Sequence, residues 1–324
     1  MHVSTGQDGE LSVSVVVPVY NGQETLARCA ESILPQLLDD DELIIVDDGS
    51  TDGTADAIRK LMKDSDRIRP VHQENGGCAA ARNRGAEESC KDAVAFCDAD
   101  DTWLPQHLRV LRSGMVRHGI PLVVSATTSV FPDGHEEAAT IAEDRLLRFA
   151  RRVEEETFLF EDGALEGYLR LAFGNTSDGM LIRRTLYEAL GGFPAEHRLI
   201  EDIRFAFPVY SENAVLYINK ALSRYYILEG SLCRADRVAA HENVIEALLN
   251  FKRTCRPLNA GERAALRQRI REAFLGLALA LWRSGRGWLK AAARSLLYGV
   301  TAGQLRMIGA MLLTSRKKEE TESA

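Results

Sequence analysis

Residues 13–20 read VSVVVPVY, and residues 42–48 read ELIIVDD. Both stretches contain short apolar runs that are rich in β-branched side chains and lack polar alternation. Such runs are typical of strands that are buried on both faces, as in a parallel sheet. Asp47 and Asp48 close the second stretch, so the end of this strand carries two carboxylates. The two stretches therefore predict strands of a parallel sheet with polar groups at their carboxyl ends.

Strand and helix patterns alternate over the first 130 residues. We expect further strands at 68–71, 94–97, 121–130 and 180–182, and helices at 23–38, 54–62, 78–89, 105–116, 184–190 and 199–210. The stretch 153–173 also has a helical pattern. This alternation predicts an α/β sandwich with a mostly parallel central sheet. In such folds ligands bind beyond the carboxyl ends of the strands.

Charge is distributed unevenly along the 324 residues. Residues 1–250 hold 25 Lys and Arg against 42 Asp and Glu, a net charge of −17, whereas residues 251–318 hold 15 against 2, a net charge of +13. Different charges suggest different partners for the two parts. We expect a disordered N-terminus at 1–11, a catalytic domain at 12–235, a helical region at 236–315 and a charged tail at 316–324.

Several classes of protein are disfavoured by composition. Hydrophobic residues make up 45% of the chain and charged residues 27%, which excludes wholesale disorder. Six cysteines without a Cys-x-x-Cys pair argue against a disulfide scaffold or a zinc module. The polar start has no signal-peptide core, and no apolar run has the length of about 20 residues that a spanning helix needs. These features predict a cytoplasmic protein.

The strand at 94–97 is followed by Asp98-Ala99-Asp100. Side chains two residues apart on an extended chain point to the same side. Two carboxylates placed in this way suit a hard divalent cation such as Mg²⁺ or Mn²⁺, which binds oxygen ligands and substrate phosphates. Taken alone, the same pattern also fits a solvated acidic turn.

Three other loops offer groups for a nucleotide. The first strand ends in Pro18, Val19, Tyr20 and Asn21, and the tyrosine ring could flank a base. After the second strand, Asp47 and Asp48 could accept hydrogen bonds from a base or ribose. The third loop, Asn75-Gly76-Gly77, opens a helix that carries Arg82 and Arg84 and could bind an anion. Each loop also fits a plain structural turn or a helix cap.

Glu201-Asp202 lies far along the chain, after Gly191-Gly192-Phe193. A carboxylate that returns to the metal edge of the sheet could serve as a general base. Taken alone, this acidic pair fits a solvated helix surface better than a catalytic base.

Together and in this order, these segments resemble the family 2 glycosyltransferases. The matching pieces are Val15 to Asn21, Val46 to Thr54, Asn75 to Gly77 with Ala81 to Gly85, Phe96 to Asp101, and Gly191 to Phe193 before Glu201-Asp202. The resemblance covers about residues 12–230. It implies a GT-A type nucleotide-binding sandwich, a nucleotide-diphosphate sugar as donor, a divalent metal (Mg²⁺ or Mn²⁺), and inverting transfer to an acceptor hydroxyl.

The resemblance also implies roles for single residues. Pro18, Tyr20 and Asp48 would line the nucleotide, with Asp47 beside them. Asp98 and Asp100 would form the metal pair, in which Asp100 ligates the ion and Asp98 lies near the ribose or the sugar. Asp202 would be the base of the Glu201-Asp202 pair.

The chain departs from the family pattern at two places. Gly22-Gln23 precede Glu24, where many members have two acidic residues directly after the first Tyr-Asn. Leu228 stands where many members have a histidine near the metal, so a third protein ligand stays open. The stretch 229–236 is a candidate to close over the donor. No processive-synthase signature is present, so we expect one sugar per encounter.

The acceptor is expected to be a glycan, a lipid-linked sugar or a protein, as in the synthesis of envelope polysaccharide, glycolipid or glycoconjugate. Two other functions stay open: a nucleotidyltransferase, which would want a basic glycine-rich loop after the first strand, and a non-catalytic relative that binds a sugar nucleotide. The oligomeric state is undetermined by the sequence.

The basic C-terminal region predicts helices at 238–253 and 262–313, broken at 285–287. Within 264–281, apolar residues recur every three to four positions: Leu266, Ile270, Phe274, Leu277 and Leu281. These helices would either pack on the catalytic domain or lie on anionic lipid at the inner face of a membrane. Nucleic acid is disfavoured, since no recognition motif is present.

Overall fold

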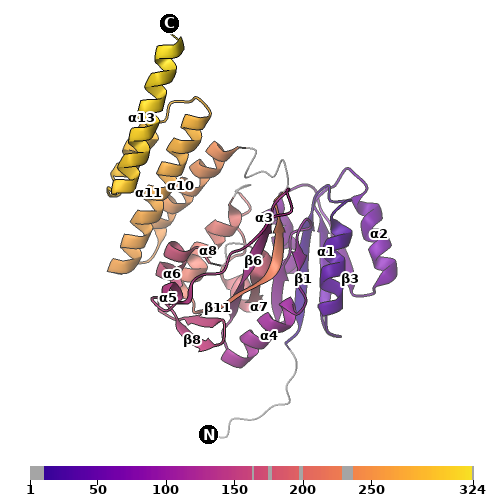
Figure 1. The fold of residues 1–324 in the computed structure, drawn as a ribbon. Helices are drawn as coiled ribbons and strands as arrows, with labels where there is room; N and C mark the ends of the chain where they lie inside the picture. The colour runs from indigo at the N-terminus through magenta and orange to yellow at the C-terminus, as the bar shows by residue number, and fades with distance from the viewer. Residues whose placement is uncertain (1–10, 163, 174–176, 197–199, 228–235, 323–324) are drawn as a thin grey trace, which may run out of the picture. The chain divides into compact units, whose positions relative to one another are not determined.

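The computed structural model describes residues 11–162, 164–173, 177–196, 200–227 and 236–322 (Figure 1). Contacts divide the chain into two compact units, residues 1–229 and 230–324, and each is described by itself. Disorder is expected for residues 1–11, and of these residues the structure describes only Leu11.

One sheet runs through the first unit in the order β3-β2-β1-β4-β10-β6-β11-β9-β8. Its strands are β1 (Val13–Val19), β2 (Glu42–Asp47), β3 (Ile68–His72), β4 (Ala93–Phe96), β6 (Leu122–Val130), β8 (Arg151–Glu154), β9 (Thr157–Phe160), β10 (Met180–Arg183) and β11 (Val215–Tyr226); β5 (Thr102–Trp103) pairs with β11, and β7 (Glu136–Ala138) with β6. Strands β3, β2, β1 and β4 are parallel, and β6 is parallel to β11. Only β10 intervenes between the two groups, antiparallel to both neighbours. The predicted α/β sheet with mostly parallel strands is confirmed.

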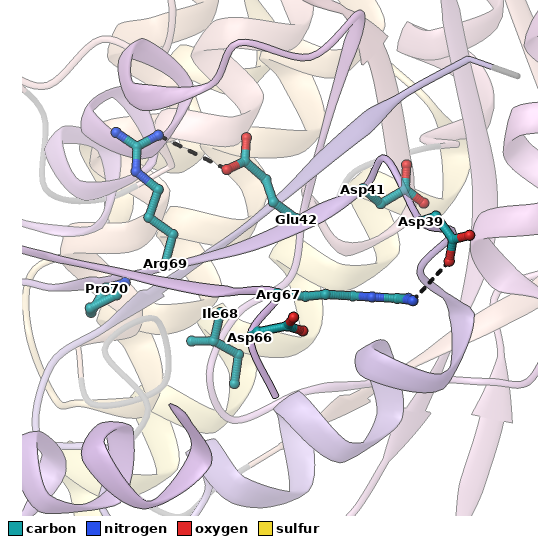
Figure 2. A pocket seen from close by; sticks show the side chains of 8 residues that line it. All are labelled: Asp39, Asp41, Glu42, Asp66, Arg67, Ile68, Arg69 and Pro70. Carbon is teal, nitrogen blue, oxygen red and sulfur yellow. Dashed lines mark hydrogen bonds and ion pairs between the residues drawn. The ribbon is translucent and has the colours of Figure 1, made fainter. Parts of the chain in front are cut away.

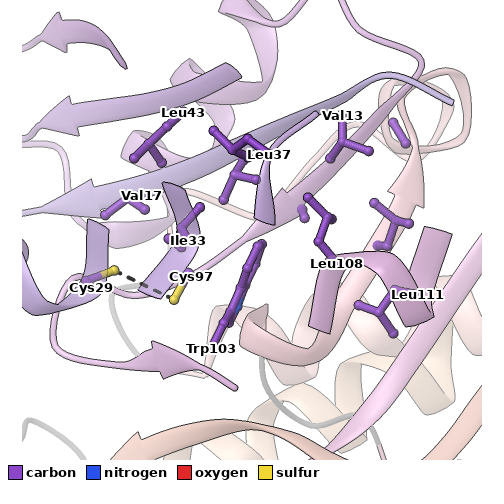
Figure 3. Packing of buried hydrophobic residues seen from close by; sticks show 14 of the residues in the cluster. Val13, Val17, Cys29, Ile33, Leu37, Leu43, Cys97, Trp103, Leu108 and Leu111 are labelled. Atoms are coloured by element: carbon purple, nitrogen blue, oxygen red, sulfur yellow. Dashed lines mark hydrogen bonds between the residues drawn. The ribbon is translucent and has the colours of Figure 1, made fainter. Parts of the chain in front are cut away.

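Helices cover both faces of this sheet. They are α1 (Leu26–Ile33), α2 (Thr54–Asp64), α3 (Cys78–Glu88), α4 (His107–His118), α5 (Glu143–Leu146), α6 (Ala164–Leu171), α7 (Arg184–Ala189) and α8 (Glu201–Glu212), with 3-10 turns η1 (Leu34–Gln36) and η2 (Ser177–Gly179). Figure 3 shows one face, where Ile33 of α1 and Leu108 of α4 pack towards Val13 and Val17 of β1. On the other face, Phe96 of β4 packs against Phe193 and Tyr187.

Helix α3 comes unusually close to the sheet because it contains Gly85. A Cβ atom at this position would lie 2.3 Å from Val16 Cγ1 of β1 and 3.1 Å from Val46 Cγ2 of β2. Only glycine leaves room for that approach. The close packing fixes the start of α3 beside the carboxyl ends of β1 and β2, where the candidate site lies.

The structure corrects one prediction in the second half of the unit and adds a strand there. Residues 153–173 are not one helix: they form the end of β8, then β9, and only then α6. The run Thr157–Phe160 is fully buried and pairs with β11, and a short apolar run of this kind does not separate strand from helix by its pattern. Strand β11 was not predicted at all.

The second unit is helical, with α10 (Arg237–Thr254), α11 (Ala260–Arg283), α12 (Leu289–Leu296) and α13 (Ala302–Glu322). The predicted break at 285–287 is present, and a second break separates α12 from α13. Leu266, Ile270, Phe274 and Leu277 of α11 are buried. Within the described part of the chain, no helix has the length and apolar character needed to cross a bilayer.

Candidate functional site

The loops that follow β1 and β2 are bonded to each other. Asn21 has a left-handed backbone with φ 51°. Its N–H donates to Ser50 Oγ at 2.9 Å, and its Oδ1 accepts from Thr51 N–H at 2.8 Å. Pro18 and Val19 are buried in β1, whereas the ring of Tyr20 is 53% exposed. Two buried residues thus hold an exposed aromatic ring at the edge of the sheet.

Asp48 holds the glycine loop in place. Its two carboxylate oxygens accept from Gln73 Nε2 at 2.7 Å and from the N–H groups of Gly76 and Gly77, each at 2.8 Å. The two backbone N–H groups therefore donate to a carboxylate of the protein itself. Gly77 has φ 89°, a conformation that favours glycine, and directly precedes α3.

Asp47 is also buried and bonded. Its Oδ1 accepts from Ser50 N–H at 2.9 Å, and its Oδ2 lies 3.1 Å from Nδ1 of His72. The His72 side chain at the end of β3 is 71% exposed. Asp47 and His72 thus form a polar pair beside Asp48, on the same edge of the sheet as Tyr20.

A buried arginine joins the acidic turn to the distant acidic pair. Arg82 of α3 is 3% exposed, and its Nη2 donates to Asp98 at 2.6 Å while its Nη1 donates to Glu201 Oε1 at 2.8 Å. Its guanidinium also lies 5.2 Å from the centroid of the Phe193 ring. The side chain of Asn83 bonds both the N–H and the carbonyl of Phe193. Helix α3 therefore brings the Gly191-Gly192-Phe193 segment and α8 to the end of β4.

Behind the acidic turn lies a group of three carboxylates, Asp98, Asp101 and Asp178, whose oxygens come within 4.8 Å of one another. Asp178 Oδ1 accepts from Asp98 N–H at 2.7 Å, and Asp101 Oδ1 from Tyr226 N–H at 2.8 Å. Burial, reinforced by the neighbouring carboxylates, raises the pKa of both Asp101 and Asp178 well above the ordinary value. The buried Asp101 Oδ2 meets no N–H or hydroxyl donor, and the Asp101 side chain is hydrogen-bonded to the Asp178 carboxyl, so the two carboxyls can share a proton. An all-carboxylate set of this kind fits a hard divalent cation once its carboxyls are ionised.

Asp100 projects from the same turn but is not a member of that group. Burial and the charge of Asp98 raise the pKa of its carboxyl. Arg28 of α1 donates to the Asp100 carbonyl at 2.7 Å and stacks over the ring of Tyr226 at 3.8 Å. The turn is thus held by α1 on one side and by Asp178 on the other.

Asp202 lies in the first turn of α8, next to the arginine-bound Glu201. Its Oδ1 accepts from Ile203 N–H at 2.8 Å. Burial, followed by the charge of Glu201, raises the pKa of Asp202 to about 7. A carboxylate with this pKa can accept a proton near neutral pH, which is what a general base does.

The structure brings most of the predicted residues to one sheet edge, but gives several of them protein partners. Arg28 and Asp178 were not predicted as parts of the site, and Asn83 and Asp101 stand in the quoted motifs without an assigned role. Arg82 was noted only as a cation near an anion, and no sequence signal marks Asp178. Leu228 and nearly all of the stretch 229–236 lie outside the described residues.

A cavity of about 620 Å³ opens at a different place (Figure 2). Its lining residues are Asp39, Asp41, Glu42, Asp66, Arg67, Ile68, Arg69 and Pro70, at the amino ends of β2 and β3. Figure 2 shows that Arg67 and Arg69 pair with Asp39 and Glu42. We place no site there, because none of the predicted groups reaches it and parallel sheets bind ligands at the opposite edge.

Comparison with known proteins gives a family match. The family model described as "Glycosyl transferase family 2" matches residues 14–191. EpsH of Bacillus subtilis is 30% identical over 226 residues, which are 67% of this chain and 61% of EpsH. Glycosyltransferase GlyA of Streptococcus pneumoniae is 31% identical over 225 residues, 68% of this chain and 31% of GlyA. The chain therefore spans less than two thirds of the length of these relatives.

Solved structures match the fold at lower identity. S. aureus TarS 1–349 in complex with UDP-GlcNAc has 17% identity and a TM-score of 0.60, covering 84% of this chain and 80% of that one. The mannosyltransferase PcManGT from Pyrobaculum calidifontis, in complex with GDP-Man and Mn²⁺, has 18% identity and a TM-score of 0.59, covering 93% and 79%. The expected GT-A type of fold is confirmed by these neighbours.

Proposed function

Because the chain belongs to glycosyl transferase family 2, we propose that it transfers one sugar from a nucleotide-diphosphate sugar to an acceptor hydroxyl, with inversion. One observation carries the proposal best: Arg82 binds Asp98 and Glu201 at once, at 2.6 and 2.8 Å. The acidic turn for the donor and the segment with the base are thereby joined through one buried side chain. An inverting displacement needs these two groups on either side of the sugar.

The donor nucleotide is assigned to the edge formed by the ends of β1 and β2. The exposed ring of Tyr20 is available to flank the base, and the pair of Asp47 with His72 offers polar atoms beside it. Asp48 and Gly77 contribute by holding the glycine loop in its bonded form. Pro18, Val19 and Asn21 would place the ring rather than bind the nucleotide through their side chains.

A divalent cation is assigned to the acidic turn. Asp98 and Asp100 would hold it, with Asp100 as the ligand and Asp98 near the ribose or the sugar. Asp101 and Asp178 lie beside Asp98, and this clustering of carboxylates agrees with a cation nearby. When bound, such an ion neutralises the charge of the leaving diphosphate.

Asp202 is assigned as the base, and Glu201 as the group that places Arg82. The acceptor alcohol is a poor nucleophile until a carboxylate takes its proton, and Asp202 stands at the start of α8 with a pKa of about 7. In the proposed step its carboxylate accepts the hydroxyl proton while the acceptor oxygen bonds to the anomeric carbon and the nucleoside diphosphate leaves.

The test uses a panel of UDP, GDP and TDP sugars with Mn²⁺, measuring release of the nucleoside diphosphate. Asp202→Asn should bind donor and metal as the wild type does, yet lose transfer by about 10²–10⁴-fold, the usual contribution of a general base. Asp100→Ala should lose the metal-dependent part of donor binding. Glu212→Gln, at the other end of α8, is the matched control and should keep full activity. Wild-type transfer by Asp202→Asn would contradict the assignment of the base.

The pH profile gives a second test. The charged form of Asp202 is the active one, so transfer should rise with pH through about 7. A raised folded pKa means that the folded state holds more protons than the unfolded state between about pH 4 and 7, so this carboxyl lowers stability as pH rises across that window. Asp202→Asn should therefore be at least as resistant to urea at pH 8 as the wild type, which separates lost chemistry from lost folding.

The acceptor is proposed to be a glycan, either free, protein-bound or lipid-linked. A lipid-linked acceptor would place the enzyme at the cytoplasmic face of a membrane. The net charge of +13 over residues 251–318 supports contact with an anionic surface of that kind.

A further inference from the structure

In and directly after α12, leucine side chains are exposed while alanine side chains are buried. In α12, Ala291 and Ala292 are buried, whereas Leu289 is 59% exposed and Leu297, directly after the helix, is 80% exposed. Burial of a leucine side chain gains more free energy than burial of alanine, so a helix packed only for internal stability would show the reverse. The exposed side of α12 therefore carries Leu289 beside the basic Lys290 and Arg294, and the exposed Leu297 follows the helix.

Exposed apolar side chains recur along the chain into α13. Val300, Leu305 and Leu312 are 59%, 53% and 44% exposed. Leu305 and Leu312 are seven residues apart, which places them on one side of the helix. Five of the nine large hydrophobic side chains that are exposed in the described part of the chain lie between Leu289 and Leu312. Such concentration is typical of a contact surface rather than of scattered exposure.

Three hydrogen bonds, one of them buried, hold the turn between α12 and α13. Gln304 is 3% exposed, and its Nε2 donates to Ser295 Oγ at 2.7 Å. Its N–H donates to Thr301 Oγ1 at 3.2 Å, while its Oε1 accepts from Thr301 N–H at 3.3 Å. These bonds fix the turn that carries Leu297 and Val300.

Basic side chains surround this apolar surface. Residues 283–312 contain no Asp or Glu. Their basic residues, all of them exposed, are Arg283, Arg286, Lys290, Arg294 and Arg306. Apolar side chains that enter the acyl boundary, together with cations that meet anionic headgroups, are the chemistry of an interfacial helix.

We propose that this α12–α13 surface, formed by Leu289, Leu297, Val300, Leu305 and Leu312 with the basic residues around them, docks on a membrane that contains anionic lipids. The apolar side of the helix predicted at 264–281 is not part of this surface, since Leu266, Ile270 and Phe274 of α11 are buried. A second copy of the chain is disfavoured because two surfaces of like charge repel each other. Nucleic acid is also disfavoured, because it would pair with the cations but leave the leucine side chains exposed to water.

This inference deepens the proposed function, because a lipid-linked acceptor would lie at such a surface. Its test does not depend on transfer. Full-length protein is sedimented with vesicles of phosphatidylcholine alone or mixed with phosphatidylglycerol. We expect binding to the mixed vesicles, weakened by salt and much stronger than binding to the zwitterionic ones.

Variants separate charge from apolar contact. Each basic residue near an anionic surface contributes about fivefold to partitioning, so Lys290→Gln with Arg306→Gln should lower binding to mixed vesicles by about 25-fold. Leu297→Gln with Val300→Gln should lower it as well. Lys60→Gln with Lys63→Gln removes the same charge from exposed positions of α2 and is the matched control, which should bind like the wild type.

Four outcomes would overturn the proposal: no binding to mixed vesicles, equal loss in the α2 control, equal binding to a duplex oligonucleotide, or self-association abolished by the Leu297 and Val300 changes without vesicle binding. Donor turnover in solution is measured on the same preparations. Failed docking with intact turnover rejects only the surface, whereas intact docking with no turnover of any donor rejects only the proposed function.

Discussion

Arg82 is the residue on which the candidate site most depends. It is buried, and each end of its guanidinium meets a different carboxylate. Removal of one partner from a buried ion pair leaves an uncompensated charge and costs about 3–5 kcal/mol. Arg82→Met should therefore lower the free energy of unfolding by about that amount and weaken donor binding, as measured by urea unfolding and calorimetry.

The control for that change lies two residues along the same helix. Arg84 is 45% exposed and pairs with Glu88, and an exposed pair of this kind contributes about 0.2–1 kcal/mol. Arg84→Met should thus change stability little. Equal losses in the two variants would show that Arg82 matters for the packing of α3 in general and not for the two carboxylates.

At the scale of elements, the packing of α3 on the sheet depends on Gly85. Alanine is the better helix former by about 1 kcal/mol, yet its Cβ would lie 2.3 Å from Val16 Cγ1, and overpacking costs about 1–3 kcal/mol. We expect overpacking to win, so Gly85→Ala should lower stability and shift α3 with Arg82. Adding Val16→Ala should recover part of the loss, since it removes the two methyl groups that clash. Unfolding of the two single variants and the double variant checks this, and simple additivity would contradict it.

The sequence determines some elements better than others. Strands β1, β2 and β4 could be predicted because both faces are buried, so their apolar runs are uninterrupted. Strand β11 escaped prediction because Lys220 and Arg224 interrupt it and its register to β6 shifts twice. The positions of Asp98, Asp100 and Asp202 followed from motif order. The contribution of Asp178 could not be predicted, because it arises from a hydrogen bond to Asp98 across 80 residues of chain.

At the scale of the whole molecule, the two units differ in charge: residues 1–229 have a net charge of −16 and residues 230–324 a net charge of +9. An acidic first unit would repel a nucleoside diphosphate, and a bound cation would offset that repulsion. The cationic C-terminal segment belongs to the second unit, which also carries the exposed leucines. Two units with separate ligands should respond to those ligands separately.

This separation leads to a prediction for unfolding of the full chain. A ligand that binds only the folded form stabilises it by RT ln(1 + [L]/Kd), about 2.7 kcal/mol at a concentration of 100 Kd. Donor with Mn²⁺ should slow hydrogen exchange in residues 11–227 and leave 236–312 unchanged, whereas anionic vesicles should protect 236–312 alone. Mass spectrometry of exchanged peptides resolves the two regions. Equal protection of both regions by either ligand would mean that the units unfold as one, because only cooperative unfolding transmits the stabilisation from one unit to the other.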